Sequence, residues 1–187
     1  PIVDNIRLSF FSWSAFSPAP EFVGLQNYRD MVDDPVFWRA LRNNTAYAAV
    51  SLVFQVALAL VLAAVLEEFV TPRLRAILRS IYFIPAVISI TVAGLLFAFI
   101  YNPRFGLLNR ALAAIGLPHW QHSWLGEQAT AIWSIIAMSQ WQSIGYTTVL
   151  FSVAIQRIPS ELYEAARVDG AGRIRSFFTI TVPMVRE

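Results

Sequence analysis

Three long stretches without a charged residue constrain the fold of this 187-residue chain more than any other feature. The stretches are residues 43–66, 80–103 and 128–156, with lengths of 24, 24 and 29 residues. A helix needs about 20 mostly apolar residues to cross the hydrocarbon core of a bilayer. A core helix of a soluble protein keeps a charged face, whereas these stretches are uncharged all the way round. The predicted transmembrane helices are residues 45–66, 81–101 and 129–156.

The composition supports an all-α, polytopic transmembrane helix bundle and argues against other classes. Hydrophobic residues make up 57% of the chain and charged residues 14%, against about 25% charged residues in a soluble domain. Without cysteine, the chain has no disulfide scaffold, thiolate metal site or cysteine nucleophile. Its net charge of +2 is too small to indicate a nucleic-acid partner. A buried helix of a large soluble protein could explain one uncharged stretch, but hardly three.

The arginines, which supply all fourteen basic charges, predict the orientation in the membrane. The segments on one side are residues 67–80 and 157–187, and those on the other are residues 1–44 and 101–128. The first side carries 8 arginines in 45 residues and the second carries 6 in 72. Because the side richer in arginine faces the cytoplasm, the Glu187 end is predicted inside and the Pro1 end outside.

The segments outside the three spans give further expectations. No signal peptide is visible at Pro1, and the sequence stops within a cytoplasmic segment, so we expect a piece of a longer membrane protein. Residues Ile2 to Phe16 form either the outer end of an earlier helix or an interfacial segment. Asp33-Asp34-Pro35 is expected to start a helix, and Gly116 to end one over Leu107 to Ile115.

Two histidines in the second outer segment are candidate metal ligands. His119 and His122 stand three residues apart, a spacing that metal sites use. No carboxylate or thiol lies close by to complete a site. The prediction is therefore that they are polar loop residues beside an interfacial tryptophan, with no metal bound.

The third predicted span carries a cluster of polar residues near its middle. Its members are Ser139, Gln140, Trp141, Gln142, Ser143, Tyr146, Thr147 and Thr148. Such groups avoid lipid and point into the bundle or into a water-filled cavity. One interpretation is a path for a polar solute, lined by Gln140, Gln142, Ser143 and Tyr146. The other is hydrogen bonding between neighbouring helices, and the sequence leaves both open.

Pro85 and Gly94 lie inside the second predicted span. Because proline has no N–H, it leaves a backbone carbonyl unpaired, and in lipid that carbonyl must find a partner on a neighbouring helix. We therefore expect a kink at Pro85, packed against protein.

A short helix is predicted directly after the third span. Ser160 is a suitable N-cap, Glu161 favours the first turn, and Gly170 can end the helix in a left-handed conformation. Glu164-Ala165-Ala166 gives this helix a surface of small side chains with one carboxylate, which a partner can approach closely. A second helical stretch is expected from Arg173 to Thr179.

The spacing of these residues resembles a known family. Glu164-Ala165-Ala166, then Gly170, then Ile180-Thr181-Val182-Pro183 resembles the EAA loop of bacterial ABC importer permeases, with Val182 where the family usually has leucine. The stretches Ile158 to Tyr163 and Asp169-Gly170-Ala171 are similar to the sugar-permease, maltose-transporter-like branch. Other similar stretches are Phe22-Val23-Gly24-Leu25-Gln26-Asn27-Tyr28, Phe37-Trp38, Asn43-Asn44-Thr45, Phe83-Ile84-Pro85, Asn102-Pro103 and Gly106-Leu107-Leu108-Asn109.

This resemblance implies an incomplete MetI-like permease core in the bacterial cytoplasmic (inner) membrane, in contact with lipid. It implies three protein partners: a second permease subunit, a dimer of ABC ATPase subunits, and an extracytoplasmic solute-binding protein. The segment 157–187 would contain the coupling helix that sits in a cleft of the ATPase. The residues implied to serve coupling are Glu164, Ala165, Ala166, Asp169, Gly170 and Pro183.

The resemblance also implies that the chain itself binds no cofactor, because ATP and Mg²⁺ would bind the partner ATPase. The chain has no G-x-x-x-x-G-K-[ST] phosphate loop and no catalytic constellation, so we expect it not to be an enzyme. The implied substrate is a sugar or a related polar solute. The alternative is a secondary transporter or channel without ATP coupling, which would be expected to carry ionisable residues in its spans. The three predicted spans contain none.

Overall fold

The computed structural model describes residues 1–14 and 19–186, and most of them are helical. Contacts divide the chain into two units, Pro1–Ala46 and Tyr47–Glu187. Part of the predicted segment that runs to Phe16, and the predicted cytoplasmic end at Glu187, lie outside the described residues.

The first unit contains two short helices, a small hairpin and the beginning of α3 (Pro35–Leu52). The helices are α1 (Ile2–Leu8) and α2 (Gln26–Asp33), and the antiparallel strands are β1 (Phe11–Ser12) and β2 (Glu21–Phe22). The Asn27 side chain donates hydrogen bonds to the carbonyls of Ser9 (2.8 Å) and Phe11 (3.1 Å), which hold α2 against the hairpin. The hairpin departs from the all-α expectation, and strands of two residues carry too short a pattern to predict.

The first predicted span lies within one long helical stretch. It comprises α3 (Pro35–Leu52), a π-helical turn η1 (Val53–Leu58) and α4 (Ala59–Phe69). The predicted start is confirmed, because the Asp34 carboxylate accepts a hydrogen bond from the N–H of Val36 (2.8 Å). By length and composition this stretch could cross a membrane, and only 17% of its apolar window is buried. A core helix of a soluble protein would be mostly buried.

The second predicted span, 81–101, is wrong as a single helix. The structure has α5 (Pro72–Val87) and α6 (Ile90–Ile100), bent by 96° at the break between them. The helix α5 continues through Pro85, which is buried as expected, to Val87. The chain turns at Ile88 and Ser89, where the Ser89 hydroxyl caps α6 by accepting from the N–H of Val92 (3.4 Å).

The third predicted span matches α8 (Gln128–Gln156) closely. With 29 residues, α8 is long enough to cross a bilayer. Because the middle of α8 is polar, its mean hydropathy is low, and among the described helices it is not one that is apolar enough to be a candidate membrane span. Between α6 and α8 lie α7 (Leu107–Ala114) and a 3₁₀ turn η2 (Pro118–Trp120). Gly116 follows α7 with φ +79°, which confirms the predicted end of that helix.

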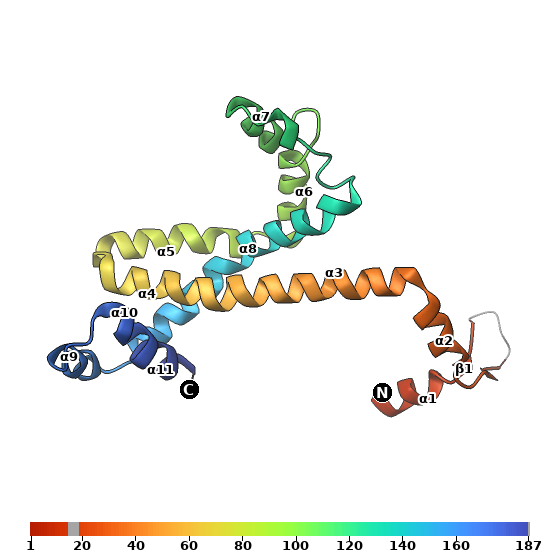
Figure 1. Ribbon diagram of the computed structural model, residues 1–187, viewed down its shortest axis with the longest axis horizontal. Helices are drawn as coiled ribbons and strands as arrows, with labels where there is room; N and C mark the ends of the chain where they lie inside the picture. Colours follow the sequence, from red (N-terminus) through yellow and green to blue (C-terminus); the bar gives the residue numbers. More distant parts are fainter. Residues whose placement is uncertain (15–18, 187) are drawn as a thin grey trace. The chain divides into compact units, whose positions relative to one another are not determined.

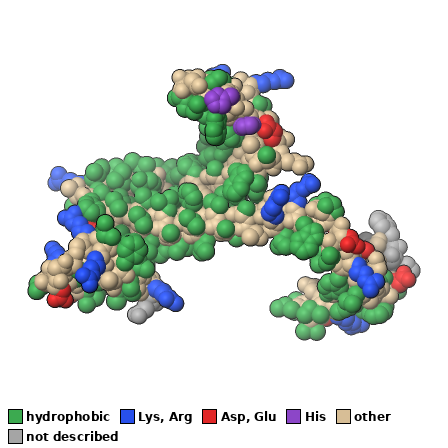
Figure 2. Space-filling view, viewed as in Figure 1, with side chains coloured by type: hydrophobic (Ala, Val, Ile, Leu, Met, Phe, Trp, Pro, Cys, Tyr) green, Lys and Arg blue, Asp and Glu red, His purple; other side chains and the backbone are tan. Residues whose placement is uncertain are grey.

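The core of the second unit forms where α8 lies against α4 and α5 (Figure 1). Its buried residues are mainly small: Ala59, Ala63 and Leu66, which share one face of α4, and Ser134, Ile136, Gln140, Gly145, Thr148 and Ser152 on α8. Small side chains allow membrane helices to approach closely. Figure 2 shows hydrophobic side chains over the outer surface of α4 and α5 and arginines gathered near the turn that joins them. An apolar exterior of this kind suits contact with lipid.

The chain after α8 folds into short helices. These are α9 (Ser160–Val168), α10 (Arg173–Ser176), a π-helical turn η3 (Phe177–Thr181) and α11 (Val182–Arg186).

The contact between α5 and α8 predicts the effect of a single methyl group. A Cβ at Gly145 would lie 1.6 Å from the carbonyl oxygen of Tyr82, so the backbones must move apart in Gly145→Ala. We expect this variant to lose about 1–3 kcal/mol of stability, which thermal unfolding of the detergent-solubilised protein would measure. Gly94→Ala in α6 is the matched control, because a Cβ there meets nothing within 4 Å. Equal melting temperatures for the two variants would contradict the close approach.

Candidate functional site

The EAA segment, defined here as residues 157–186, presents its central motif at the surface. Glu164 and Ala165 are exposed on α9, and Ala166 is half-buried. The expected N-cap role of Ser160 is wrong, because Ser160 is already helical and the extended residue before it, Pro159, is the N-cap. Proline in this position leads the chain directly into the helix, so no side-chain cap is made.

The turn after α9 is closed by backbone hydrogen bonds. The N–H of Ala171 donates to the carbonyl of Ala166 (2.8 Å), and the N–H of Gly170 donates to the carbonyl of Arg167 (3.1 Å). This pair of bonds is the Schellman arrangement, which requires a left-handed residue at the position of Gly170. Gly170 has φ +76°, as predicted, and both it and the preceding Asp169 are exposed.

The second half of the EAA segment packs back onto α9. Its helix starts at Arg173, as predicted, but it continues through the π-helical turn η3 and past the exposed Pro183 to Arg186 instead of ending at Thr179. The hydroxyls of Tyr163 on α9 and Thr181 on η3 are hydrogen-bonded at 2.8 Å. Thr181 is 4% exposed, so this bond joins the two halves through a buried residue.

Several large apolar side chains remain exposed on the EAA segment. They are Leu162, Val168, Ile174, Phe178 and Met184. Together with the exposed Glu164, they give the segment a mixed apolar and acidic exterior. Exposed apolar groups of this kind mark a contact surface for another protein.

A cleft of about 430 Å³ lies between the EAA segment and the ends of α4 and α8. Its lining residues are Ala64, Glu67, Glu68, Ile155, Tyr163, Arg167, Ala171, Arg173, Ser176, Phe177 and Thr181. The carboxylates of Glu67 and Glu68 lie on the α4 wall of the cleft, and Arg167 and Arg173 lie on the EAA wall. Polar contacts across the cleft therefore join the EAA segment to the membrane helices.

Glu67, at the end of α4, is the most connected charged residue of this region. Its side chain is 10% exposed and forms ion pairs with Arg75 (2.7 Å) and Arg79 of α5. It also accepts a hydrogen bond from Gln156 of α8 (3.2 Å). In the sequence Glu67 marks only the end of an uncharged stretch, because its partners are brought to it by the fold.

Two members of the polar cluster of α8, Ser139 and Gln140, bond to the first predicted span. Gln140, which is 5% exposed, donates to the hydroxyl of Ser51 (2.9 Å) and accepts from the Gln55 side chain (3.2 Å). The hydroxyl of Ser139 contacts that of Tyr47 at 2.5 Å. Tyr47, Ser51 and Gln55 recur every fourth residue and so share one face of a helix. Their four-residue spacing is visible in the sequence and could have predicted this polar face.

The other candidates on α8 differ in their surroundings. The Gln142 side chain donates to the carbonyl of Ile88 (2.8 Å), one of the backbone groups freed where α5 ends. Ser143 is half-buried. Tyr146 is 52% exposed, and its ring lies 6.4 Å from that of Phe83. The structure thus uses Gln140 and Gln142 to join helices and leaves Tyr146 accessible.

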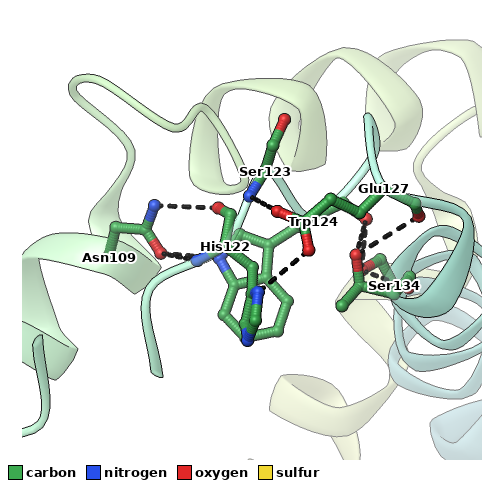
Figure 3. Close-up of polar contacts among 7 residues, drawn as sticks. Asn109, His122, Ser123, Trp124, Glu127 and Ser134 are labelled. Carbon is green, nitrogen blue, oxygen red and sulfur yellow. Dashed lines mark hydrogen bonds and ion pairs between the residues drawn. The ribbon is translucent and has the colours of Figure 1, made fainter. Parts of the chain in front are cut away.

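The segment between α7 and α8 is ordered around Asn109 of α7, which is 6% exposed (Figure 3). Its side-chain oxygen accepts from the indole N–H of Trp124 (2.7 Å), and its amide nitrogen donates to the carbonyls of His122 (3.0 Å) and Pro103 (3.3 Å). Its backbone carbonyl accepts from the Gln121 side chain (2.7 Å). One buried amide therefore fixes the loop that leads into α8.

Glu127, immediately before α8, forms a second set of contacts in this loop (Figure 3). Its carboxylate accepts from the N–H of Ser123 (2.7 Å) and lies 2.9 Å from Nδ1 of His122. The expectation that no carboxylate lies near the histidines is therefore wrong, and Glu127 stands only five residues after His122. Within residues 1–14 and 19–186, no group of three histidine, cysteine, aspartate or glutamate side chains could hold a metal ion. The hydrogen bond from Ser123 lowers the pKa of Glu127; burial opposes this shift and His122 adds to it.

Comparison with known proteins identifies related sequences along the whole chain. The family described as "Binding-protein-dependent transport system inner membrane component" matches residues 55–186. The probable ABC transporter permease protein YurN of Bacillus subtilis is 54% identical over the whole chain, which spans 64% of that protein. The diacetylchitobiose uptake system permease protein NgcF of Streptomyces coelicolor is 39% identical, and the chain spans 55% of it. The chain therefore spans less than two thirds of these relatives.

A solved structure shares the fold. It is the crystal structure of a bacterial ABC transporter involved in the import of the acidic polysaccharide alginate. The TM-score is 0.80 at 26% identity, with 98% of this chain and 62% of the other covered.

The lowered pKa of Glu127 predicts how the outer loop responds to acid. The stabilisation is present above the carboxyl's ordinary pKa of 4.5 and is lost as the pH falls through the lower pKa of the folded state. We expect the melting temperature of the wild-type protein to fall below about pH 4.5 more steeply than that of Glu127→Gln, which has no carboxylate to protonate. Parallel melting curves against pH for the two proteins would contradict the role given to Glu127.

Proposed function

Because the chain belongs to the family of binding-protein-dependent transport system inner membrane components, we propose that it is part of a permease subunit of an ATP-driven importer. The substrate is a sugar or a related polar solute. The observation that carries the proposal is the exposed Glu164-Ala165-Ala166 on α9, closed by the turn at Gly170, within the stretch that matches the family. Family membership also favours ATP-driven import over a secondary transporter or channel.

The substrate class rests on relatives with different printed substrates. One relative is named as a diacetylchitobiose uptake permease and another, from Thermococcus litoralis, as a trehalose/maltose transport permease. The structural relatives belong to an importer of alginate, and one was solved in complex with an alginate-bound periplasmic protein. These substrates are all saccharides. We therefore assign saccharides or similar polar solutes to this chain, delivered by an extracytoplasmic solute-binding protein.

The Glu164-Ala165-Ala166 surface of α9 and the turn at Gly170 form the proposed docking surface for a partner ATPase, which binds ATP and Mg²⁺ and performs hydrolysis. Glu164 pairs with a basic group of the ATPase, and the small side chains of Ala165 and Ala166 permit close contact. Leu162 and Val168 add apolar contact area at the edges of this surface. Asp169 and Gly170 form the turn, and Pro183 lies in the helix that follows. In this arrangement the permease does not hydrolyse ATP itself.

The arginine distribution supports a cytoplasmic EAA segment and an outer Pro1 end. A second permease subunit completes the path, and α8 contributes to it through its polar middle. Tyr146, which is exposed, and the adjacent Ser143 are the side chains best placed to meet a solute. Transport then proceeds by alternating access around a site near the middle of the membrane.

The docking role predicts that Glu164→Arg abolishes ATP-driven uptake by the full transporter without preventing membrane insertion. Gly170→Pro should have the same effect, because proline fixes φ near −65° and removes the N–H that bonds to Arg167. Uptake of labelled sugars into proteoliposomes, and capture of the ATPase by the purified subunit, are the measurements. Glu161→Arg makes the same charge change elsewhere on α9 and should retain most activity. Normal uptake in both coupling variants would remove the docking assignment.

The polar cluster of α8 predicts two separable effects. Tyr146→Ala should change the substrate dependence of uptake with little loss of stability, because the ring is largely exposed. Gln140→Ala should lower stability by about 1 kcal/mol, because it leaves the side chains of Ser51 and Gln55 without this partner. Uptake kinetics with several sugars and thermal unfolding separate the effects. If substitutions of Gln140, Gln142 and Tyr146 all leave the kinetics unchanged, the cluster serves helix packing alone.

A further inference from the structure

We propose, on the basis of the function above, that Glu68 and Arg173 form a second mechanical connection between the EAA segment and the membrane helices. The first connection is covalent, because α9 follows α8 directly along the chain. The second is an ion pair between the end of α4 and the first residue of α10. Glu68 and Arg173 act as positioning residues that transmit movement of the docked EAA segment to α4.

The geometry holds the Arg173 guanidinium between two consecutive residues of α4. Nε of Arg173 lies 3.1 Å from a carboxylate oxygen of Glu68. Its Cζ lies 4.8 Å from the centre of the Phe69 ring, within the range of a cation–π contact. An ionic and an aromatic contact together fix the direction of the side chain, which one exposed ion pair alone would not do.

On the EAA side, Arg173 belongs to a segment whose parts are joined by internal hydrogen bonds. The hydroxyl bond between Tyr163 and Thr181 joins α9 to η3, and the turn between α9 and α10 is closed by the bond from Ala171 to Ala166. A displacement of α9 is therefore passed on to Arg173 instead of being absorbed in a loose loop.

On the membrane side, Glu68 is next to the residue that joins three helices. Glu67 binds Arg75 and Arg79 of α5 and Gln156 of α8. Because Glu67 and Glu68 are consecutive on α4, force applied to Glu68 reaches α5 and α8 through side chains already paired.

The surroundings of the ion pair suit transmission better than stabilisation. Glu68 and Arg173 both line the cleft of about 430 Å³, so the EAA segment is not packed solidly against α4 and has room to move. The side chains are 41% and 68% exposed, and an exposed ion pair adds little to folding stability. Reversing one charge should therefore leave the folded protein intact and affect the coupling between ATP hydrolysis and transport.

The experiment uses the complete transporter in proteoliposomes and measures sugar imported per ATP hydrolysed. We expect Glu68→Arg and Arg173→Glu each to lower this ratio at least fivefold, with normal assembly and melting temperature. The double variant restores the pair in reverse and should recover at least half of the wild-type ratio. Arg175→Glu is the matched control, because it makes the same charge change on α10 away from α4, and it should keep the wild-type ratio.

The outcomes separate this inference from the proposed function. If the wild-type complex shows no ATP-driven uptake, the proposed function fails. If the wild type transports and Glu164→Arg does not, but the single reversals at Glu68 and Arg173 keep the wild-type ratio, only the connection fails. Loss without recovery in the double variant, or an equal loss in Arg175→Glu, also overturns it.

Discussion

Polar groups within a membrane helix have no water to bond, and this constraint organises the second unit of the chain. Gln140 of α8 is hydrogen-bonded to Ser51 and Gln55 of the first predicted span. The Gln142 side chain donates a hydrogen bond to the carbonyl of Ile88, where α5 ends. Each pairing requires the helices to lie close together. Gly145 provides that closeness, because its missing side chain lets α8 approach the backbone of α5. The bend between α5 and α6 is thus supported by the helix that packs against it.

The EAA segment is ordered by different interactions, because it lies outside the apolar helices. Its main motif is left exposed, and its internal order comes from backbone bonds around Gly170 and from the contact between Tyr163 and Thr181. Charged contacts then gather at the end of α4, where Glu67 faces α5 and α8 and Glu68 faces Arg173. An exposed element that is hydrogen-bonded within itself and attached to several helices through a few polar contacts is suited to moving as a body.

Features governed by local chemistry could be predicted from the sequence, and features governed by a distant partner could not. The apolar runs located the helices that contain the first and third predicted spans, and the conformational freedom of glycine located the turns at Gly116 and Gly170. The break at Ile88 and Ser89 escaped prediction, because it depends on Ser89 as a cap and on Gln142 from another helix. The N-cap predicted at Ser160 was wrong, because the preceding residue, Pro159, is the N-cap of α9. Glu67 gave no signal because its partners are assembled only by the fold, whereas Tyr47, Ser51 and Gln55 carried a helical spacing that could have been recognised.

The 96° bend between α5 and α6 bears on how this protein adapts to bilayers of different thickness. With 11 residues, α6 is about 16 Å long, roughly half of the hydrocarbon core. A straight helix adjusts to a thinner or thicker bilayer by tilting as a rod. Here α6 cannot tilt independently in this way, because the hydroxyl of Tyr101 at its end donates to the carbonyl of Ser134 on α8 (3.2 Å) and its Phe97 ring lies 5.1 Å from that of Trp141. A change in bilayer thickness therefore acts on α6 and α8 together.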